Sequence, residues 1–142
     1  MSKKTVFVSF DYDDDKDYRY LLKAWNANPQ FEFVWRDTTP NEIQSTNIDR
    51  IKAVLTTKIN SAKYTLIIIG KNANKLHRDH ALIGFKNWIN FEINKSKKNG
   101  NKLVGVKIDR SYESPDELIN AGASWAMSFG QDPIIEALNK AN

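Results

Sequence analysis

Residues 85–93 place a carboxylic acid where a carboxylic acid is not expected. If this stretch is read as a helix of about 100° per residue, one stripe carries the apolar residues Phe85, Trp88, Ile89 and Ile93. The other side carries Lys86, Asn87, Asn90 and Asn94. Glu92 falls in the middle of the apolar stripe, although desolvating a carboxylate is costly unless it is paired or protonated. Glu92 is therefore expected either to look into a polar cavity or to be the buried partner of a cation.

A carboxylate next to a tryptophan suits the cleavage of an N-glycosidic bond. Such a reaction passes through an oxocarbenium-like ribosyl centre, which a carboxylate can stabilise or trap. Trp88 can stack on a base or a nicotinamide ring, and loops with Phe10, Asp11 and Asp37 are expected to face the same place. The residues alone leave a second interpretation open, in which Glu92 forms an ion pair with a nearby Lys or Arg.

Several other chemistries are disfavoured by what the sequence lacks. A phosphoacceptor domain needs an Asp after the third strand, where this chain has Gly70 and Lys71, and neither G-x-G-x-x-G nor G-x-x-x-x-G-K-[ST] occurs. With no Cys there is no thiol nucleophile and no thiolate zinc site. His77 and His80 flank Asp79, but they have no third clear ligand, so we expect no metal site.

The elements that must position Glu92 alternate along the chain. Short apolar and β-branched runs predict strands at 5–10, 31–35, 64–69, 103–108 and 124–127. Helical spacing and caps predict helices that end near 28, at 48–59, from 85 into the segment 96–100 with Gly100 as its stop, from 115 to 121 and from 133 onward. Alternation implies parallel pairing, so we predict an α/β fold, a flavodoxin-like three-layer sandwich with a central parallel sheet of about five strands. Ligands bind at the carboxyl ends of such strands, here in the loops at 10–15, 36–41, 70–84 and 109–113.

Composition describes one soluble globular domain spanning residues 1–142, with 41% hydrophobic and 27% charged residues. The longest apolar run, residues 66–69, is too short to span a bilayer, and no signal peptide is visible, so we expect a cytoplasmic protein with no membrane partner. The net charge of +4 is dispersed. The small cluster of Lys95, Lys97 and Lys98 suits the C-terminus of a helix, which makes nucleic acid an unlikely partner.

Four segments resemble the TIR domain family in matching order. Val-Phe-Val-Ser-Phe at 6–10, followed by acids, resembles its first strand, and Trp-Arg-Asp at 35–37 resembles the strand end that opens the so-called BB loop. Trp-Ile-Asn-Phe-Glu-Ile at 88–93 resembles the W-x-x-x-E segment of NAD-cleaving TIR proteins. Together with Ile-Ile-Ile-Gly-Lys-Asn at 67–72, it is most similar to the bacterial TIR-like proteins of the Thoeris anti-phage defence system. The resemblance covers about residues 6–108 and implies a TIR-like sandwich.

The resemblance also implies roles for single residues. Glu92 would be the catalytic carboxylate, and Trp88 would form a wall of its pocket. The residues implied in contacts with the nucleotide or at its gating loop are Phe10, Asp11 and Asp37. Many TIR enzymes carry an Arg directly after the first-strand aromatic, where this chain has Asp11-Tyr12. The phosphate contacts are therefore expected from the basic loop that begins at Lys71.

The activity that the resemblance implies is cleavage of NAD⁺ into nicotinamide and ADP-ribose. NAD⁺ would be a substrate, so no cofactor is expected. Thoeris members make a cyclic or conjugated ADP-ribose signal that activates a separate effector, and self-association on activation is expected; the cyclic form is the product predicted for this chain. Two alternatives remain: a TIR-like interaction scaffold without chemistry, and a sensor that binds nucleotide without turnover.

Overall fold

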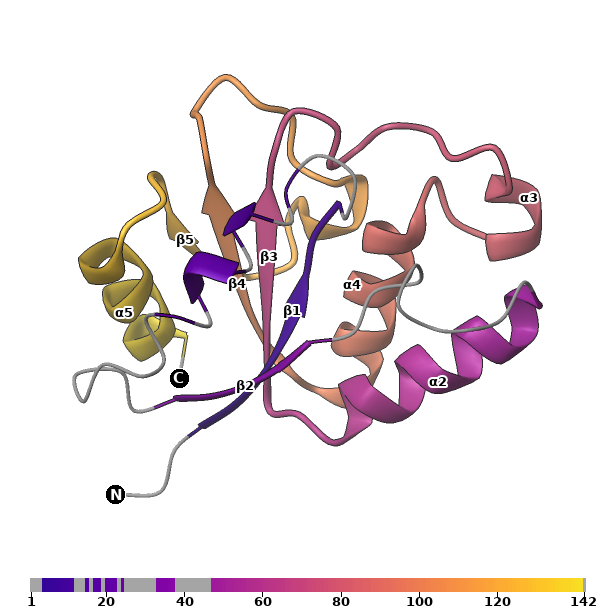
Figure 1. The fold of residues 1–142 in the computed structure, drawn as a ribbon, viewed down its shortest axis with the longest axis horizontal. Coiled ribbons are helices and arrows are strands. Elements are labelled where there is room, and N and C mark those ends of the chain that lie inside the picture. Colours follow the sequence, from indigo (N-terminus) through magenta and orange to yellow (C-terminus); the bar gives the residue numbers. More distant parts are fainter. Residues whose placement is uncertain are drawn as a thin grey trace.

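The computed structural model of the protein describes residues 4–11, 15, 17–18, 20–22, 24, 33–37 and 47–141. Five parallel strands form one sheet in the order β2-β1-β3-β4-β5 (Figure 1). The strands are β1 (Lys4–Ser9), β2 (Phe33–Asp37), β3 (Tyr64–Ile69), β4 (Lys102–Lys107) and β5 (Ser124–Ala126). The predicted five-stranded parallel sheet is confirmed.

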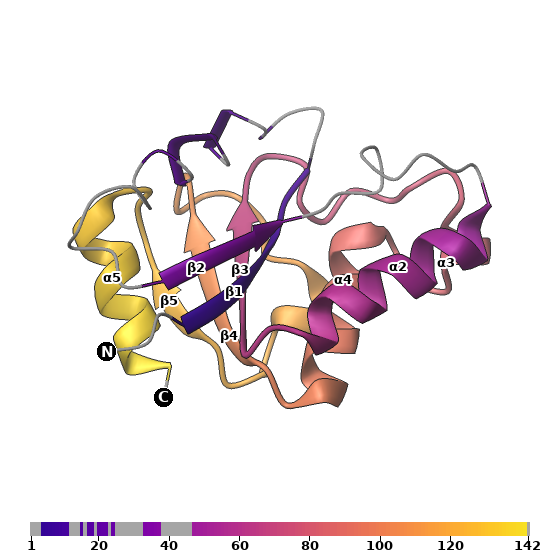
Figure 2. The ribbon, with the colours of Figure 1, turned by 60° about the horizontal axis from the view of Figure 1, so that its bottom comes forward.

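Helices cover both faces of this sheet. The elements are α2 (Ile48–Asn60), α3 (His80–Ile83), α4 (Trp88–Asn99), the 3₁₀ turn η2 (Asp116–Leu118) and α5 (Gln131–Lys140). The described residues between 15 and 24 are also helical. Figure 2 shows α2 and α4 on one side of the sheet and α5 on the other, so the three-layer sandwich is confirmed. None of the helices in the described ranges is long and apolar enough to cross a membrane.

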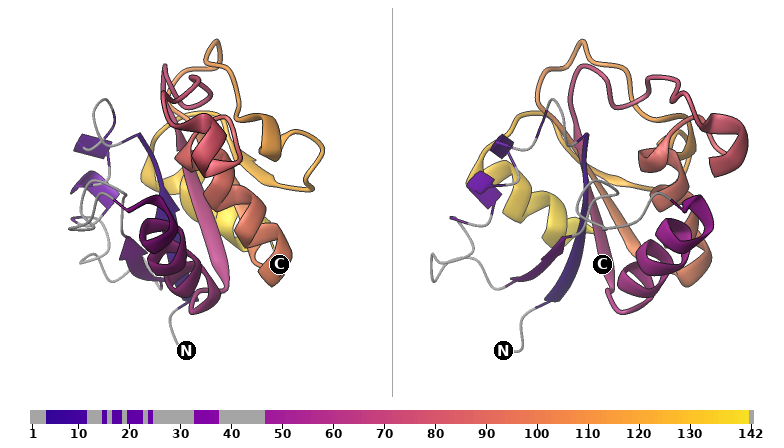
Figure 3. Two further views of the ribbon diagram at one scale, coloured as in Figure 1. Left: turned by 90° about the vertical axis from the view of Figure 1, so that its right-hand side faces the viewer. Right: turned by 45° about the vertical axis from the view of Figure 1, so that its right-hand side comes forward.

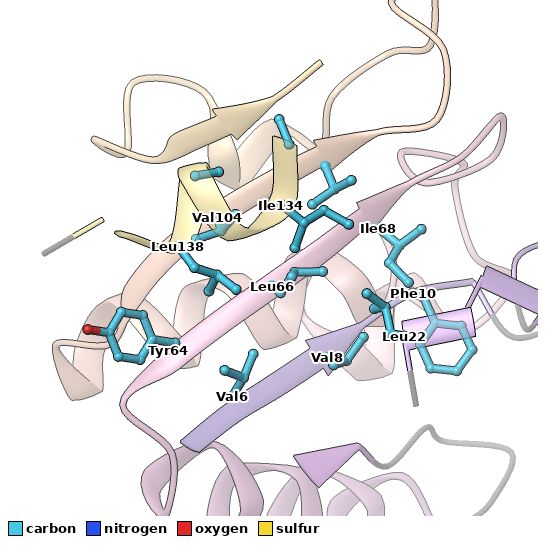
Figure 4. Close-up of a cluster of buried hydrophobic side chains, with 13 residues drawn as sticks. Val6, Val8, Phe10, Leu22, Tyr64, Leu66, Ile68, Val104, Ile134 and Leu138 are labelled. Carbon is cyan, nitrogen blue, oxygen red and sulfur yellow. The ribbon is translucent and has the colours of Figure 1, made fainter. Parts of the chain in front are cut away.

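Strand periodicity divides the core between the two faces. Val6 and Val8 of β1 point toward α5, together with Leu66 and Ile68 of β3 (Figure 4). Phe7 points to the opposite face and packs with α2 and α4. Every residue of β3 is buried, as expected for a strand covered on both faces.

The strand order reverses beside β1. From β1 the chain continues to β2 on one side, and it returns to β3 on the other side. This is the switch point at which ligands bind in flavodoxin-like sheets. The loops that follow β3 and β4 lie at this carboxyl edge, at the top of both views in Figure 3.

Some predicted boundaries are wrong, each for a local reason. Helix α4 begins at Trp88 rather than at Phe85, because the side chain of Asn87 accepts a bond from the backbone N–H of Asn90 and caps the helix there. The other end of this helix is as predicted, since Gly100, with φ of 78°, ends it. The predicted helix at 115–121 is only the single turn η2, since the backbone is extended again at Ile119.

Two other segments differ from the predicted elements. Strand β2 reaches Asp37, two residues beyond the predicted end, because its pairing with β1 continues to the Val8–Asp37 register. The predicted loop at 70–84 contains the short helix α3, which ends at Gly84 with φ of 85°.

Candidate active site

The side chain of Glu92 lies against the end of β1. The hydroxyl of Ser9, the last residue of β1, donates a hydrogen bond to Glu92 Oε1 at 2.6 Å. Both side chains are buried, with Glu92 2% and Ser9 1% exposed. No described Lys or Arg forms an ion pair with Glu92, so the interpretation in which a cation partners the carboxylate finds no support in the described ranges. The pair lies at the carboxyl end of β1, where the strand order reverses.

Burial changes the acidity of Glu92. Desolvation raises its pKa from 4.5 to about 8, and the hydrogen bond from Ser9 opposes that rise. Desolvation dominates because one hydroxyl replaces only part of the hydration that a carboxylate loses. A carboxyl group with such a pKa is mostly protonated at pH 7 and can change charge when a ligand alters its surroundings.

Helix α4 is fixed to the sheet one turn beyond Glu92. The hydroxyl of Ser96 donates to the backbone carbonyl of Glu92 at 2.8 Å and lies 2.6 Å from the hydroxyl of Thr65 on β3. The side chain of Asn101 donates to the same Thr65 hydroxyl at 3.2 Å. These buried bonds hold Glu92 at a fixed height above the sheet.

Trp88 lies one turn before Glu92 and is 9% exposed. Its ring meets the ring of Phe91 edge-on, with centroids 5.5 Å apart and an interplanar angle of 83°. Both rings belong to the cluster that joins α4 to Phe7 and α2. In this structure Trp88 is therefore a packing residue beside Glu92, and its role as a pocket wall stays a prediction.

The structure places the residues after β1 differently from the expectation. Phe10 is 3% exposed and packs beside Leu22 in the core of the α5 face (Figure 4). Its ring therefore points away from the face that holds Glu92, and the structure gives no support to its predicted contact with a nucleotide. Asp11 is half-buried at the carboxyl edge, where its backbone carbonyl accepts a bond from the N–H of Asp15.

The remaining predicted binding residues also lie at the carboxyl edge. Asp37 ends β2 in register with Val8 of β1; the residues that follow, 38–46, lie outside the described ranges. Lys71 is exposed, two residues after the end of β3. Within the described part of the chain, no group of three His, Cys, Asp or Glu side chains could hold a metal ion.

Three buried asparagines on α4 and its neighbouring loop were not predicted as structural residues. Asn74, Asn87 and Asn90 are 5%, 7% and 1% exposed. Asn90 donates to the side-chain oxygens of Asn74 at 3.1 Å and of Asn87 at 3.0 Å, and it accepts a bond from the backbone N–H of Glu117 at 2.9 Å. Asn87 donates to the carbonyls of Ala73 and Lys75, both at 2.9 Å.

Asn74 completes this asparagine cluster. It donates to Glu113 at 3.0 Å and to Asp116 at 2.9 Å, and it accepts a bond from the backbone N–H of Asp116. The cluster ties the loop after β3, the start of α4 and η2 into one unit. The helical period had placed Asn87 and Asn90 opposite the apolar stripe, and this side of α4 is buried as well.

The sequence contains a signal for the position of two further residues at the carboxyl edge of the sheet, Ser9 and Asp15. Ser9 occupies the alternate position to Val8 and Phe10, so strand periodicity alone places it on the face of Phe7 and, with it, of α4. Asp15, from the acidic run after β1, is 4% exposed and packs over Gly70. A Cβ atom at Gly70 would overlap the carboxylate oxygens of Asp15, so this position needs a glycine.

Comparisons with known proteins agree with this picture. The model of the family described as "Thoeris protein ThsB, TIR-like domain" matches residues 7–113. A curated protein named "Putative cyclic ADP-D-ribose synthase ThsB1", from Bacillus cereus (strain MSX-D12), is 26% identical over 110 residues, which are 75% of this chain and 52% of that protein. The chain thus spans about half the length of this relative.

Two solved structures show weaker likenesses. One is a 2-desoxiribosyltransferase from Leishmania mexicana, with 15% identity and a TM-score of 0.49 over 81% of this chain and 76% of that chain. The other is the TIR domains of the activated Roq1 resistosome that recognises the pathogen effector XopQ, with 18% identity and a TM-score of 0.46 over 77% and 61%. The family assignment depends on the sequence match over residues 7–113. Because that match covers most of the chain, the protein belongs to the TIR-like domain family of the Thoeris protein ThsB.

Proposed function

We propose that this protein cleaves the bond between nicotinamide and ribose in NAD⁺ and makes an ADP-ribose-derived signal for anti-phage defence. The observation that carries the proposal is the Glu92 carboxyl group, buried at the carboxyl end of β1 with a pKa of about 8. The name of the Bacillus cereus relative supports a cyclic product.

The proposed chemistry uses Glu92 as an anion. When the glycosidic bond breaks, its electron pair leaves with nicotinamide, which becomes neutral. The ribosyl carbon is left with the positive charge of an oxocarbenium ion, and a carboxylate held beside it lowers the energy of that charge. A hydroxyl or ring nitrogen of the same ADP-ribose then attacks the ribosyl carbon and closes a ring; attack by water gives the linear product. The proton that an attacking hydroxyl or water loses goes to the Glu92 carboxylate, which returns to its protonated form.

Substrate binding would supply the charge change. The nicotinamide ring of NAD⁺ is cationic, and an opposite charge a few ångströms away favours the ionised form of a carboxyl group. Glu92 would lose its proton as the ring enters and would be ionised when the bond breaks. Since Glu92 is 2% exposed, the substrate must displace the groups that cover it.

The experiment is to measure nicotinamide release from NAD⁺ by the wild type and by Glu92→Gln, alone and in lysate of infected cells. Glutamine keeps the shape of the protonated acid but cannot become an anion, so we expect the rate to fall by roughly 10²–10³-fold. The matched control is Glu136→Gln, on the exposed side of α5, where Glu136 bonds only Lys140 among the described residues. This variant should retain the wild-type rate.

Equal release by the wild type and Glu92→Gln under every condition would overturn the proposal and favour a scaffold. Self-association on activation, and an effector reached through the diffusible product, belong to the same proposal. Sedimentation of the protein before and after activation tests the first, and transfer of the filtered reaction products to effector-containing lysate tests the second.

A further inference from the structure

A cavity of about 710 Å³ lies at the end of the sheet opposite to Glu92. Its lining residues come from the starts of β4 and β5, the ends of α4 and α5 and the segment 120–123. The polar side chains that line it belong to Lys97, Asn101, Lys102, Asn120, Ser124 and Lys140. Small-molecule sites have volumes of roughly 300–1,000 Å³, so this cavity has the size of a site for a nucleotide-sized molecule.

The charge of the lining has one sign. Three lysines reach the cavity from three elements, Lys97 from α4, Lys102 from β4 and Lys140 from α5, and the lining holds no Asp or Glu. The surrounding edge continues this pattern. Residues 58–63, 97–102, 119–124 and 139–141 contain no acidic residue, and their lysines are Lys58, Lys63, Lys97, Lys98, Lys102 and Lys140.

Helix dipoles explain part of this distribution. The C-terminus of a helix favours cations, and Lys58, Lys97, Lys98 and Lys140 lie in last turns. The helix dipole does not explain the position of Lys102, because this residue is the first of strand β4.

The lysines of the cavity also differ in their partners. Lys97 lies 3.4 Å from Glu117, and Lys140 lies 2.8 Å from Glu136. Lys97 also donates to the backbone carbonyl of Glu117 at 2.9 Å. The Lys140–Glu136 pair is solvent-exposed, and pairs of this kind contribute little to stability. Within the described ranges no acid forms an ion pair with Lys102, so this lining residue carries a charge that no described carboxylate neutralises.

We propose that this cavity, the amino-edge pocket, binds a phosphorylated small molecule. Ammonium groups bind phosphate as point charges, and three lysines line this cavity, whose lining contains no carboxylate. Ser124 and Asn120 add hydroxyl and amide groups to the wall. Ala121, Ala123 and Ala141 line the remainder with small apolar groups that suit the non-phosphate part of the molecule. The proposal does not depend on NAD⁺ cleavage, because the pocket and Glu92 lie at opposite ends of the sheet.

The test is an NMR titration of the ¹⁵N-labelled protein with tripolyphosphate and, separately, with adenosine 5′-diphosphate. We expect saturable shifts of the amides of Gly100, Lys102, Gly122 and Ser124, and these shifts should persist in Glu92→Gln. Lys102→Gln should weaken binding roughly tenfold, as expected for the loss of one charged phosphate contact. Lys58→Gln, which removes an exposed lysine of the same edge outside the lining, should leave the affinity unchanged.

Three results would overturn the proposal. The first is the absence of saturable shifts at these amides for either probe at millimolar concentration. The second is an equal loss of affinity in Lys102→Gln and Lys58→Gln, which would indicate attraction to the general charge of the edge. The third is tight binding of single-stranded RNA, measured in a parallel titration, with no binding of either small phosphate, which would indicate a macromolecular partner.

Discussion

Buried polar side chains lie on two sides of helix α4 and its N-cap, and the two sides differ in how many hydrogen bonds these side chains receive. On one side, every N–H of the Asn87 and Asn90 amides has a partner, and Asn90 also accepts a bond from the N–H of Glu117, so these amides join α4 to residues 73–75 and to η2. On the other side, the carboxyl group of Glu92 receives one hydrogen bond, from Ser9, and no described cation. Both regions are equally buried, so burial does not distinguish them.

The two regions differ in whether their buried polar atoms have enough hydrogen-bond or ionic partners. A fully bonded polar network in a low-dielectric interior fixes one arrangement of the chain. A carboxyl group with too few partners instead keeps a raised pKa and can still change its charge, which is the property of many catalytic groups. We therefore interpret the asparagine cluster as the support of α4 and Glu92 as the group that the support presents to a substrate.

The largest expected effect on stability is a gain when Glu92 is replaced by Gln. The pKa of Glu92 is about 8 in the folded protein and near 4.5 when unfolded. Between these values the unfolded chain has lost the proton that the folded protein keeps, so stability falls as pH rises, by about 1.4 kcal/mol per unit. Glutamine has no proton to lose. The free energy of unfolding of this variant at pH 7 should exceed that of the wild type by a few kcal/mol, although its rate of nicotinamide release should fall.

Denaturant unfolding at a series of pH values checks this. The difference between Glu92→Gln and the wild type should be greatest above pH 8 and should nearly disappear at pH 4.5. If Glu92→Gln is equally or less stable than the wild type at pH 8, burial does not raise the pKa of Glu92. The contrast with the asparagine cluster would then be false.

The opposite result is expected from the asparagine cluster. Asn90→Ala removes three side-chain hydrogen bonds and leaves the N–H of Glu117 without its partner. The side-chain oxygen of Asn74 keeps the bond from the N–H of Asp116. The unsatisfied N–H costs roughly 1–3 kcal/mol and each other lost hydrogen bond about 1 kcal/mol, so the free energy of unfolding should fall by about 2–4 kcal/mol.

The same variant should not change the acidity of Glu92, which Asn90 does not contact. The pH at which nicotinamide release is half-maximal should therefore stay at its wild-type value, while the rate falls. Asn60→Ala, at the exposed end of α2, is the control and should leave both stability and rate unchanged. A shifted midpoint in Asn90→Ala would show that the two regions are not independent.

The sequence predicts one of the two regions better than the other. Glu92 is conspicuous because a charged residue interrupts an apolar period, and that signal is local. Asn87 and Asn90 give no such signal, since amides opposite an apolar stripe normally face water. Their burial depends on carbonyls of residues 73–75 and on the N–H of Glu117, which distant parts of the chain bring to α4.

The position of Phe10 shows that the two-residue period of a strand decides which side chains can reach α4. The alternation in β1 puts Val6, Val8 and Phe10 on one face, and Phe7 and Ser9 on the other. The family resemblance directed attention to the aromatic ring of Phe10, whereas the two-residue period assigns the face of α4 to Ser9. Four of the five parallel strands were predictable because their apolar runs are long enough to identify. The fifth, β5, has only three residues and was predicted at 124–127 on a weaker signal.

The smallest expected change, and the most specific, is that of Ser9→Ala. The hydroxyl of Ser9 lowers the pKa of Glu92 through its bond to Oε1, so its removal should raise that pKa further. If Glu92 acts as an anion, the profile of kcat/KM against pH, which reports the free enzyme, should rise at a higher pH than in the wild type. Near pH 7 each unit of that shift lowers the ionised fraction about tenfold, while the alkaline plateau should be nearly retained.

Ser9→Thr keeps the hydroxyl and should return the midpoint toward the wild-type value, whereas a void left by the lost oxygen would lower the whole profile without moving it. A midpoint that stays in place or moves to lower pH would contradict an anionic role for Glu92, even if Glu92→Gln is inactive.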